Sequence, residues 1–350
     1  MFEESRIFKE ERALHPEYLP GILPHREEEV KRIAKNLTPA SKGRIPQNTF
    51  LYGAPGLGKT ASTKFVFREF EKFSGIKTVY LNCWDYKTAP TILSKICIEL
   101  GIFVQRRGIS KDEILERFVN EWKKEREGLI VCLDEVDQLI FKEQEALYDL
   151  VRINQYFENP LGLVLISNDP SIFIGLEPRI RSSLNLDEIE FKPYNLEEMR
   201  DILEERARLA FHSIEAPAIL LAANRAVELG GDVRIGLECL LRAGKLAESE
   251  NSKEVGVKHM KKIILSVKPI KLELIKRRLS ETERLILKIL EEKSSLPSTE
   301  LYSIYQSSTE FPVSDRKFRD CISHLAQLKL IKIFEGKKGL RGRTRLIAKA

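Results

Sequence analysis

The chain has 350 residues, of which 43% are hydrophobic and 31% charged, a composition typical of a soluble globular protein with two or three domains. No apolar run approaches the roughly 18 residues of a transmembrane helix. Because the N-terminus is charged and lacks an apolar signal region, we expect a cytoplasmic protein with no membrane partner. The five cysteines form no C-x-x-C pair, which favours buried reduced thiols over a zinc site or disulfide frame.

The net charge of +6 is unevenly distributed along the chain. Residues 311–350 hold 11 basic and three acidic residues, a net charge of +8, whereas residues 1–310 hold 47 basic and 49 acidic residues. Such asymmetry predicts that the C-terminal part binds a polyanion. A solvated basic tail is the alternative interpretation.

The segment that precedes the first strand is expected to begin as an irregular N-terminal arm. Three prolines between residues 16 and 24 exclude a helix there, and a helical run follows to Lys35. Apolar side chains of this arm, Tyr18 and Leu23 among them, could cover an adenine ring beside a phosphate site. Simple packing of the arm on the core is the alternative, and His25 is expected to be a structural histidine.

Residues 53–60, Gly-Ala-Pro-Gly-Leu-Gly-Lys-Thr, match the phosphate-binding loop G-x-x-x-x-G-K-[ST]. A short buried strand, Thr49–Tyr52, precedes the loop and a helix, Ala61–Phe73, follows it, as the motif requires. The glycines let several N–H groups point at one anion, Lys59 would reach the β- and γ-phosphates, and Thr60 would ligate Mg²⁺. A chance glycine-rich turn is the alternative. The residues predicted to bind ATP or ADP here are Gly53, Ala54, Pro55, Gly56, Leu57, Gly58, Lys59, Thr60 and Ala61.

Further strands are expected at Lys77–Asn82, Leu129–Leu133, Leu161–Ser167 and Glu188–Lys192. Because they alternate with helices, the fold class is predicted to be α/β with a parallel sheet and right-handed crossovers. The helices between the strands are expected to cover residues 86–126, with a break near residues 106–108, and residues 143–157.

Polar residues at the strand ends complete a hydrolytic site. Asp134 and Glu135 end an apolar strand downstream of the phosphate loop, where a Mg²⁺-orienting Asp and a water-activating Glu are needed. Asn168 ends the next strand and could orient the attacking water, although a turn cap is the alternative. Arg179 and Arg234 could stabilise developing phosphate charge. Taken alone, each arginine would more often form a surface salt bridge than act on phosphate. Only its place in the order of these motifs makes it a candidate catalytic residue.

The rest of the chain is predicted to be helical up to a short C-terminal sheet. Residues 1–194 form the α/β base, and residues 195–270 read as an all-α lid with a break at Gly230-Gly231. Gly236 is expected to interrupt the helix that follows Arg234. Residues 271–279 are expected to be a linker, and residues 280–350 a separate domain.

This C-terminal domain begins with a capping box, because Ser280 stands three residues before Glu283. Helices are expected through Leu290 and over residues 299–305 and 314–328. Two short strands, residues 332–335 and 344–347, flank a glycine- and base-rich loop. Three helices followed by a basic hairpin are the pattern of a winged-helix DNA-binding domain.

The order of these motifs along the chain resembles that of a known protein family. Residues 53–60, 129–135, 163–168, 177–184 and 231–234 look like the Walker A, Walker B, sensor 1, arginine-finger and sensor 2 elements of AAA+ ATPases. More narrowly, three further segments resemble the archaeal replication initiators of the origin recognition complex and cell division control protein six family. These segments are Leu23-Pro24-His25-Arg26, Phe191-Lys192-Pro193-Tyr194-Asn195 and Gly342-Arg343-Thr344-Arg345.

The resemblance implies a weak ATPase that binds duplex origin DNA in the nucleoid and helps to recruit the replicative helicase, with paralogous initiator subunits as further partners. ATP binding and slow hydrolysis would act as a conformational switch. It implies catalytic roles for Glu135, Asn168, Arg179 and Arg234, and metal binding by Thr60 and Asp134. It also implies nucleotide contacts from Tyr18, Leu23, Arg26, Tyr194 and Arg234. The DNA contacts that it implies are Arg316, Lys317 and Arg319 on a recognition helix, Lys337, Lys338, Arg341, Arg343 and Arg345 on the wing, and Arg106 and Arg107 in the insertion.

One departure from the family pattern concerns the arginine finger. Ser182-Ser183 stands where many AAA+ proteins have a Ser-Arg pair, so Arg179 is chosen, with Arg181 as the alternative. Two other functions stay open at this point: an ATP-regulated winged-helix transcription regulator, and an AAA+ DNA-remodelling ATPase.

Overall fold

The computed structural model divides the chain into two compact units, Met1–Val267 and Lys268–Ala350. Each unit is described by itself below. The described residues are 5–104, 110–122, 128–155, 161–267, 279–293, 295–309, 312–327, 330–339 and 342–349.

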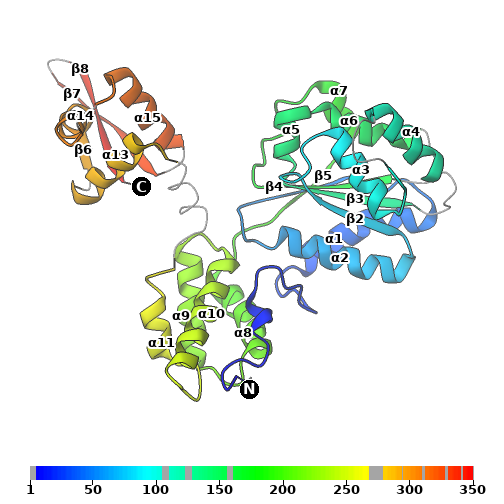
Figure 1. Ribbon diagram of the computed structural model, residues 1–350, viewed down its shortest axis with the longest axis horizontal. Coiled ribbons are helices and arrows are strands. Elements are labelled where there is room, and N and C mark those ends of the chain that lie inside the picture. Colours follow the sequence, from blue (N-terminus) through cyan, green and yellow to red (C-terminus); the bar gives the residue numbers. More distant parts are fainter. Residues whose placement is uncertain are drawn as a thin grey trace. The chain divides into compact units, whose positions relative to one another are not determined.

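The first unit is built around a parallel five-stranded sheet, which confirms the predicted α/β class (Figure 1). The strand order β2-β3-β4-β1-β5 puts the strand before the phosphate loop between the strands that end in Ser167 and Glu190. The last strand lies slightly earlier than the predicted residues 188–192. The strands are β1 (Thr49–Tyr52), β2 (Lys77–Asn82), β3 (Leu129–Asp134), β4 (Leu161–Ser167) and β5 (Asp187–Glu190).

Helices cover both faces of the sheet, which explains why β3 and β4 are buried throughout and apolar up to their last residues, Asp134 and Ser167. Ile130 and Cys132 face the core formed with the first two helices, whereas Val131 and Leu133 face the core formed with the others. The first face carries α1 (Glu27–Leu37) and α2 (Lys59–Ser74), and the second carries α3 (Ala89–Glu99), α4 (Lys111–Trp122), α5 (Asp137–Glu143), α6 (Glu145–Arg152) and α7 (Pro178–Leu184).

The single helix expected over residues 143–157 was wrong in its bounds. The chain forms α5 and α6 instead, and then a 3-10 turn, Ile153–Gln155. The break expected near residues 106–108 lies outside the described residues.

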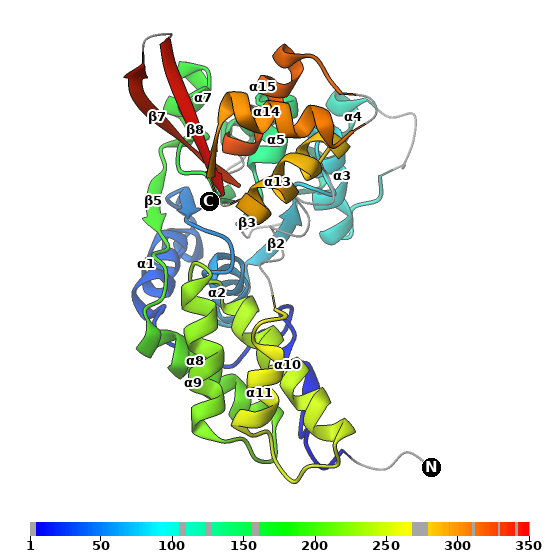
Figure 2. The same ribbon diagram turned by 90° about the vertical axis from the view of Figure 1, so that its left-hand side faces the viewer.

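Four helices form the lid, as predicted (Figure 2). The expectation that Gly236 interrupts a helix is wrong, because α10 runs through it without a break. A Cβ at this position would lie 2.6 Å from Leu203 Cδ1, so the glycine allows α10 to pack closely on α8. The lid helices are α8 (Leu196–Ala210), α9 (Ala216–Glu228), α10 (Val233–Ser249) and α11 (Val257–Ile263).

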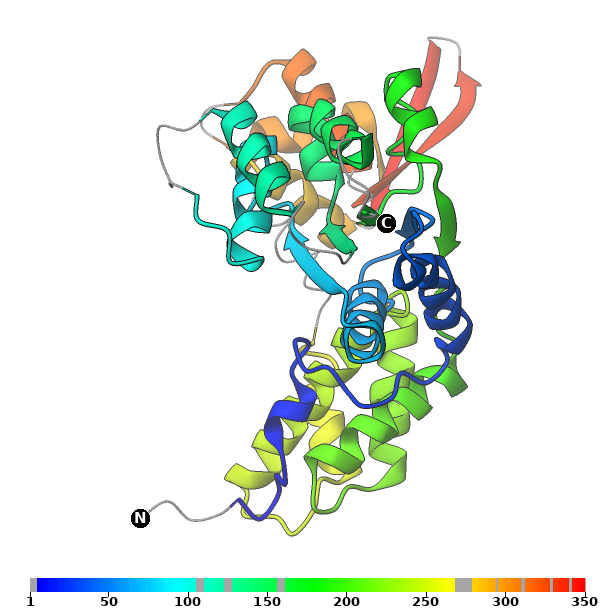
Figure 3. The same cartoon turned by 90° about the vertical axis from the view of Figure 1, so that its right-hand side faces the viewer.

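The N-terminal segment packs on the lid, although it lies within the residues assigned to the base. The backbone N–H of Lys9 donates to Ala210 O at 2.8 Å, and that of His212 donates to Ile7 O at 3.0 Å. The Phe8 ring lies 5.3 Å from that of Phe211. Figure 3 shows this segment, in dark blue, following the lid helices before it crosses to α1. The described residues that precede the base therefore make their contacts with the lid.

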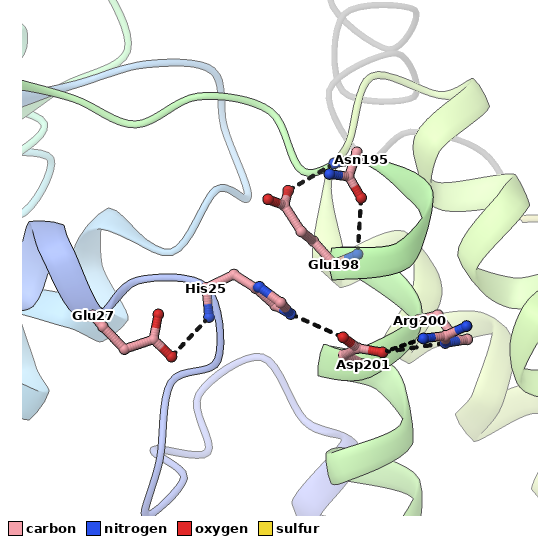
Figure 4. A network of polar contacts seen from close by, with 6 residues as sticks. All are labelled: His25, Glu27, Asn195, Glu198, Arg200 and Asp201. Atoms are coloured by element: carbon pink, nitrogen blue, oxygen red, sulfur yellow. Dashed lines mark hydrogen bonds and ion pairs between the residues drawn. The ribbon is translucent and has the colours of Figure 1, made fainter.

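Where this segment reaches the base, it is tied to the lid a second time. His25 Nε2 lies 3.1 Å from Asp201 Oδ2 on α8, and Arg200 binds the other oxygen of the same carboxylate (Figure 4). The helix itself begins in a capping box formed by Asn195 and Glu198. His25 thus has a structural partner.

In its described residues, the second unit combines three helices with a small antiparallel sheet, the arrangement of a winged helix. The capping box at Ser280 and Glu283 is confirmed by the bond from Ser280 N to Glu283 Oε2 at 2.8 Å. The two predicted strands are longer than expected. A third strand, β6, was not predicted because it has only three residues. The elements are α13 (Glu281–Lys293), β6 (Ser295–Pro297), α14 (Ser298–Ser307), α15 (Asp315–Gln327), β7 (Ile331–Gly339) and β8 (Gly342–Lys349), with the sheet order β6-β8-β7.

The cysteines are free thiols; four are buried and Cys321 is partly exposed. Within the described ranges, no helix has both the length and the apolar composition needed to cross a bilayer.

Candidate functional site

The phosphate loop joins β1 to α2 in a conformation that depends on glycine. Gly56 and Gly58 have φ values of +76° and +91°, and Gly58 is the left-handed N-cap of α2. A Cβ on Gly56 would lie 1.8 Å from Asp232 Oδ1, and one on Gly58 would lie 3.1 Å from the Tyr194 hydroxyl. Any L-side chain at either position would therefore be strained, and at Gly56 it would also collide with the lid.

Lys59 is almost completely buried at the start of α2. Its Nζ donates to Gly53 O at 2.8 Å, to Ala54 O at 2.9 Å and to Asn168 Oδ1 at 3.0 Å. Burial lowers the pKa of Lys59 to about 8, although the charge of Asp134 acts in the opposite direction. The structure thus places Asn168, a predicted site residue, next to Lys59. It also shows that Lys59 is bonded to carbonyl groups of the phosphate loop.

Asp134 lies at the end of β3, beside the start of α2. Its Oδ2 accepts hydrogen bonds from Thr60 Oγ1 and from the Tyr80 hydroxyl, both at 2.6 Å. Tyr80 is on β2, the neighbour of β3, and burial raises its pKa far above the ordinary value. The phenol therefore stays protonated and can only donate to the carboxylate.

Glu135 follows Asp134 in a strained conformation with φ +53°. A side chain other than glycine in this region costs about 1–2 kcal/mol. Its backbone N–H donates to Asp134 Oδ1 at 2.8 Å, and burial, then the charges of Asp134 and Asp137, raise the pKa of Glu135. Among the described residues, no hydrogen-bond partner reaches its buried Oε2. Such a carboxylate is a stronger base than usual.

These features fit Mg²⁺. Thr60 and Asp134 place a hydroxyl and a carboxylate oxygen side by side, and oxygen atoms are the ligands that this ion prefers. Glu135 adds a second negative charge next to them. Thr60 and Asp134 are therefore the residues that would hold a divalent cation.

Arg234 lies in the first turn of α10, on the lid. Its guanidinium is held by a fork to Asp232, with Nε–Oδ1 at 2.9 Å and Nη2–Oδ2 at 2.7 Å. The Val233 N–H donates to Gly56 O at 3.2 Å, so this end of the lid touches the phosphate loop directly. The hydrogen bond to Asp232, and then the charge of that carboxylate, raise the pKa of Arg234, which keeps it cationic.

Arg179 lies elsewhere, on α7. Its Nε donates to Glu177 Oε2 at 2.6 Å, its guanidinium lies 5.5 Å from the centre of the Tyr148 ring, and 57% of its side chain is exposed. Arg179 does not line the cavity formed by the other site residues. The structure therefore does not bring Arg179 together with the other predicted site residues.

Two residues predicted to touch nucleotide also hold the backbone of the phosphate loop. Arg26 Nε and the Tyr194 hydroxyl both donate to Leu57 O, at 3.0 and 3.1 Å. The guanidinium also donates to Lys192 O at 2.7 Å and lies 3.9 Å from the centre of the Tyr194 ring. Arg26 and Tyr194 line the cavity, but their polar groups are already used to fix the phosphate loop.

A cavity of about 390 Å³ joins these residues, between the carboxyl ends of β3 and β4 and the lid. The carbonyls of Gly53 and Ala54 are turned to Lys59, and neither residue lines the cavity. The predicted residues that line it are Tyr18, Leu23, Arg26, Pro55, Gly56, Leu57, Gly58, Lys59, Thr60, Ala61, Asp134, Glu135, Asn168, Tyr194 and Arg234.

Three residues of this site were missed from the sequence: Tyr80, Arg206 and Asp232. Asp232 stands in the segment Gly231–Arg234, where its N-cap position was a usable signal. Tyr80 and Arg206 carry no local signal, because their roles depend on which strand lies beside β3 and on which helix faces the N-terminal segment.

The predicted DNA-contacting side chains of α15 are all exposed in the second unit. Arg319 is paired with Asp315 one turn earlier on the same helix. On the wing, β7 contains Lys337 and Lys338, and β8 contains Arg343 and Arg345. Arg106, Arg107 and Arg341 lie outside the described residues.

Comparison with known families agrees with this geometry. Residues 45–171 match the AAA domain family, and residues 200–263 match the Cdc6 AAA+ ATPase-type lid domain. The phosphate loop, the acidic strand end and the lid arginine thus define a protein of the AAA+ class with a Cdc6-type lid.

The chain is 34% identical to ORC1-type DNA replication protein 1 of Archaeoglobus fulgidus over 361 aligned positions, covering 99% of this chain and 88% of that one. It is equally similar, at 34%, to the protein of the same name from Sulfurisphaera tokodaii, covering 97% and 89%. The solved structure of Aeropyrum pernix ORC1 in complex with DNA has a TM-score of 0.77 at 32% identity, covering 99% and 94%. The chain belongs to the family of archaeal ORC1-type DNA replication proteins.

Proposed function

We propose that this protein is a replication initiator that binds ATP and duplex origin DNA and helps to recruit the replicative helicase. The observation that carries the proposal is the union of a buried phosphate-binding site with a separate unit that exposes a cationic helix. The relative from Aeropyrum pernix in complex with DNA supports the second half of the proposal.

In the proposed site, the N–H groups of the loop and Lys59 bind the phosphates of ATP. For this, Lys59 exchanges its bonds to Gly53 O and Ala54 O for bonds to phosphate oxygens. Thr60 and Asp134 are the residues that would hold Mg²⁺, which when bound neutralises charge on the β- and γ-phosphates. The neutral phenol of Tyr80 keeps the Asp134 carboxylate oriented.

Hydrolysis would follow from the two residues at the strand ends. Asn168 orients a water molecule, and Glu135 removes its proton as the oxygen attacks the γ-phosphorus and the bond to the β–γ bridging oxygen breaks. The raised pKa of Glu135 suits it to accept this proton. Arg234 stabilises the charge from the lid, and Arg179 would act only on a neighbouring molecule.

The conformational change on ATP binding would be transmitted from the phosphate loop to the lid through Gly56 and Asp232, which lie in contact across the site. DNA would be bound by α15 in the major groove, through Arg316, Lys317 and Arg319, and by the wing in the minor groove or along the phosphates. The helicase and paralogous initiator subunits would be the protein partners.

Chromatin-wide mapping of binding sites at nucleotide resolution tests this function. We expect sites to coincide with replication start sites and to vanish in a variant with Arg316→Gln and Lys317→Gln. Sites concentrated at promoters would instead indicate a transcription regulator and contradict the proposal.

A further inference from the structure

The segment between residues 5 and 27 is held at both ends and crosses the nucleotide cavity between them. Its first part is bound to the lid through Phe8, Lys9 and the ion pair of Glu11 with Lys245 at 3.0 Å. Its last part is bound to the base through Arg26, which holds Leu57 O. The residues between these anchors, Tyr18 and Leu23 among them, line the cavity.

Arg206 of α8 organises the middle of this segment. Its Nε donates to Ala13 O at 2.5 Å, its Nη2 to His15 O at 2.8 Å and its Nη1 to Tyr18 O at 3.3 Å. The guanidinium also lies 5.0 Å from the centre of the Tyr18 ring. One side chain of the lid therefore binds three backbone carbonyls within residues 13–18 of the N-terminal segment.

The environment of Arg206 is unusual for an arginine. It is only 8% exposed, and burial lowers its pKa to about 10. Among the described residues, no carboxylate lies within ion-pair distance of it, so carbonyl dipoles and an aromatic face balance the charge. A buried cation bound only to backbone is costly to keep, and its bonds would be hard to replace with another residue.

The position of Arg206 along the cavity separates it from the phosphate chemistry. Arg206 lines the cavity together with Tyr18, Leu23, Ile202 and Leu237, whereas the phosphate-binding groups lie on the loop at residues 53–60. Between residues 16 and 24, the segment that Arg206 supports lines the cavity mostly with proline, leucine, isoleucine and tyrosine side chains, and Glu17 is the charged exception. This lining suits the flat face of a nucleotide base, not its phosphates.

We propose that Arg206 is a positioning residue that fixes the N-terminal segment to the lid, so that the segment forms the wall against which the base of the bound nucleotide packs. This inference rests on the proposed ATP binding. Because the wall is anchored to the lid and the phosphate loop belongs to the base domain, a bound nucleotide joins the two parts of the unit.

The test separates the two ends of the nucleotide. In the full-length chain, Arg206→Gln should weaken ADP binding by on the order of tenfold or more, because the base loses its fixed wall. Binding of inorganic tripolyphosphate with Mg²⁺, which has no base, should stay within about twofold of wild type. Calorimetric titration measures both. The matched control is Arg242→Gln, which removes an exposed arginine of the lid paired with Glu238; both affinities should then be unchanged.

Each other outcome overturns the inference. An equal loss for ADP and tripolyphosphate would show that Arg206 holds the unit together as a whole, and no loss for either would show that the wall does not depend on it. Wild-type protein that binds neither ligand would refute the proposed function itself. If Arg206→Gln does not fold, Arg206→Lys gives the same comparison, because it keeps the charge but cannot reach all three carbonyls. It should weaken ADP binding selectively, by a smaller factor.

Discussion

The two units use their cationic side chains in opposite ways. In the first, Lys59 and Arg206 are buried and each is fixed by three hydrogen bonds to other groups. In the second, Arg316 and Lys317 stand exposed on one helix. A buried cation has a fixed geometry that one ligand satisfies, whereas exposed cations on a helix add up over a long polyanion. Single substitutions should therefore be severe in the first unit and graded in the second.

The largest expected effect comes from Lys59→Ala. Without the ammonium group, the phosphates lose the buried charge of Lys59, and ATP affinity should fall by on the order of 100-fold or more. Duplex DNA binding should remain within a few-fold of wild type, because the cationic helix belongs to the other unit. Nucleotide titration and fluorescence anisotropy with duplex DNA measure the two effects. Loss of both activities in a folded variant would break the division between the units.

The nucleotide site also shows what could be predicted from the sequence. The phosphate loop and Asp134-Glu135 were predictable because their chemistry is local: glycines at left-handed positions, a lysine at the start of a helix, and acids at the end of a buried strand. The roles of Arg26 and Tyr194 were not predictable. Both side chains donate to Leu57 O, which lies 31 positions from Arg26 and 137 positions from Tyr194 in the chain.

The same distinction holds for the rest of the fold. The parallel sheet and the helical lid followed from hydrophobic periodicity, which is a property of each segment alone. The continuity of α10 through Gly236 could not be predicted in this way. The glycine is needed there because Leu203, on another helix, leaves no room for a Cβ atom. Likewise, the place of residues 5–18 on the lid depends on partners such as Ala210 and Phe211, about 200 positions later.

A smaller effect, on pH dependence, should also be confined to the nucleotide site. The pKa of Lys59 is lowered from 10.5 to about 8 in the free protein, and bound phosphates should raise it again. Above about pH 8, nucleotide binding must then take up a proton, and ADP affinity should fall by up to about tenfold per pH unit; below that pH it should be flat. The free protein itself gains stability as pH rises from 8 towards 10.5, because the charged lysine is disfavoured only when folded.

Titration calorimetry in buffers of different ionisation enthalpy measures this proton uptake. Lys64→Gln is the control, because it removes another lysine that lines the cavity, one that lies over the Tyr80 ring. It should keep the change in slope near pH 8. A flat affinity between pH 7 and 10 in the wild-type protein would contradict the assignment to Lys59.

The smallest effects are expected in the second unit, and they should differ between neighbours on one helix. Arg316→Gln should weaken duplex binding by about tenfold if it reads a base edge, or lower the slope of log Kd against log salt by about 0.9 if it contacts a phosphate. Arg319→Gln should cost less, because Arg319 is paired with Asp315 in the free protein and must give up that pair to reach DNA. Anisotropy titrations at several salt concentrations compare the two. If Arg319→Gln cost as much as Arg316→Gln or more, α15 would have to bind DNA through its Asp315 side, with the ion pair opened.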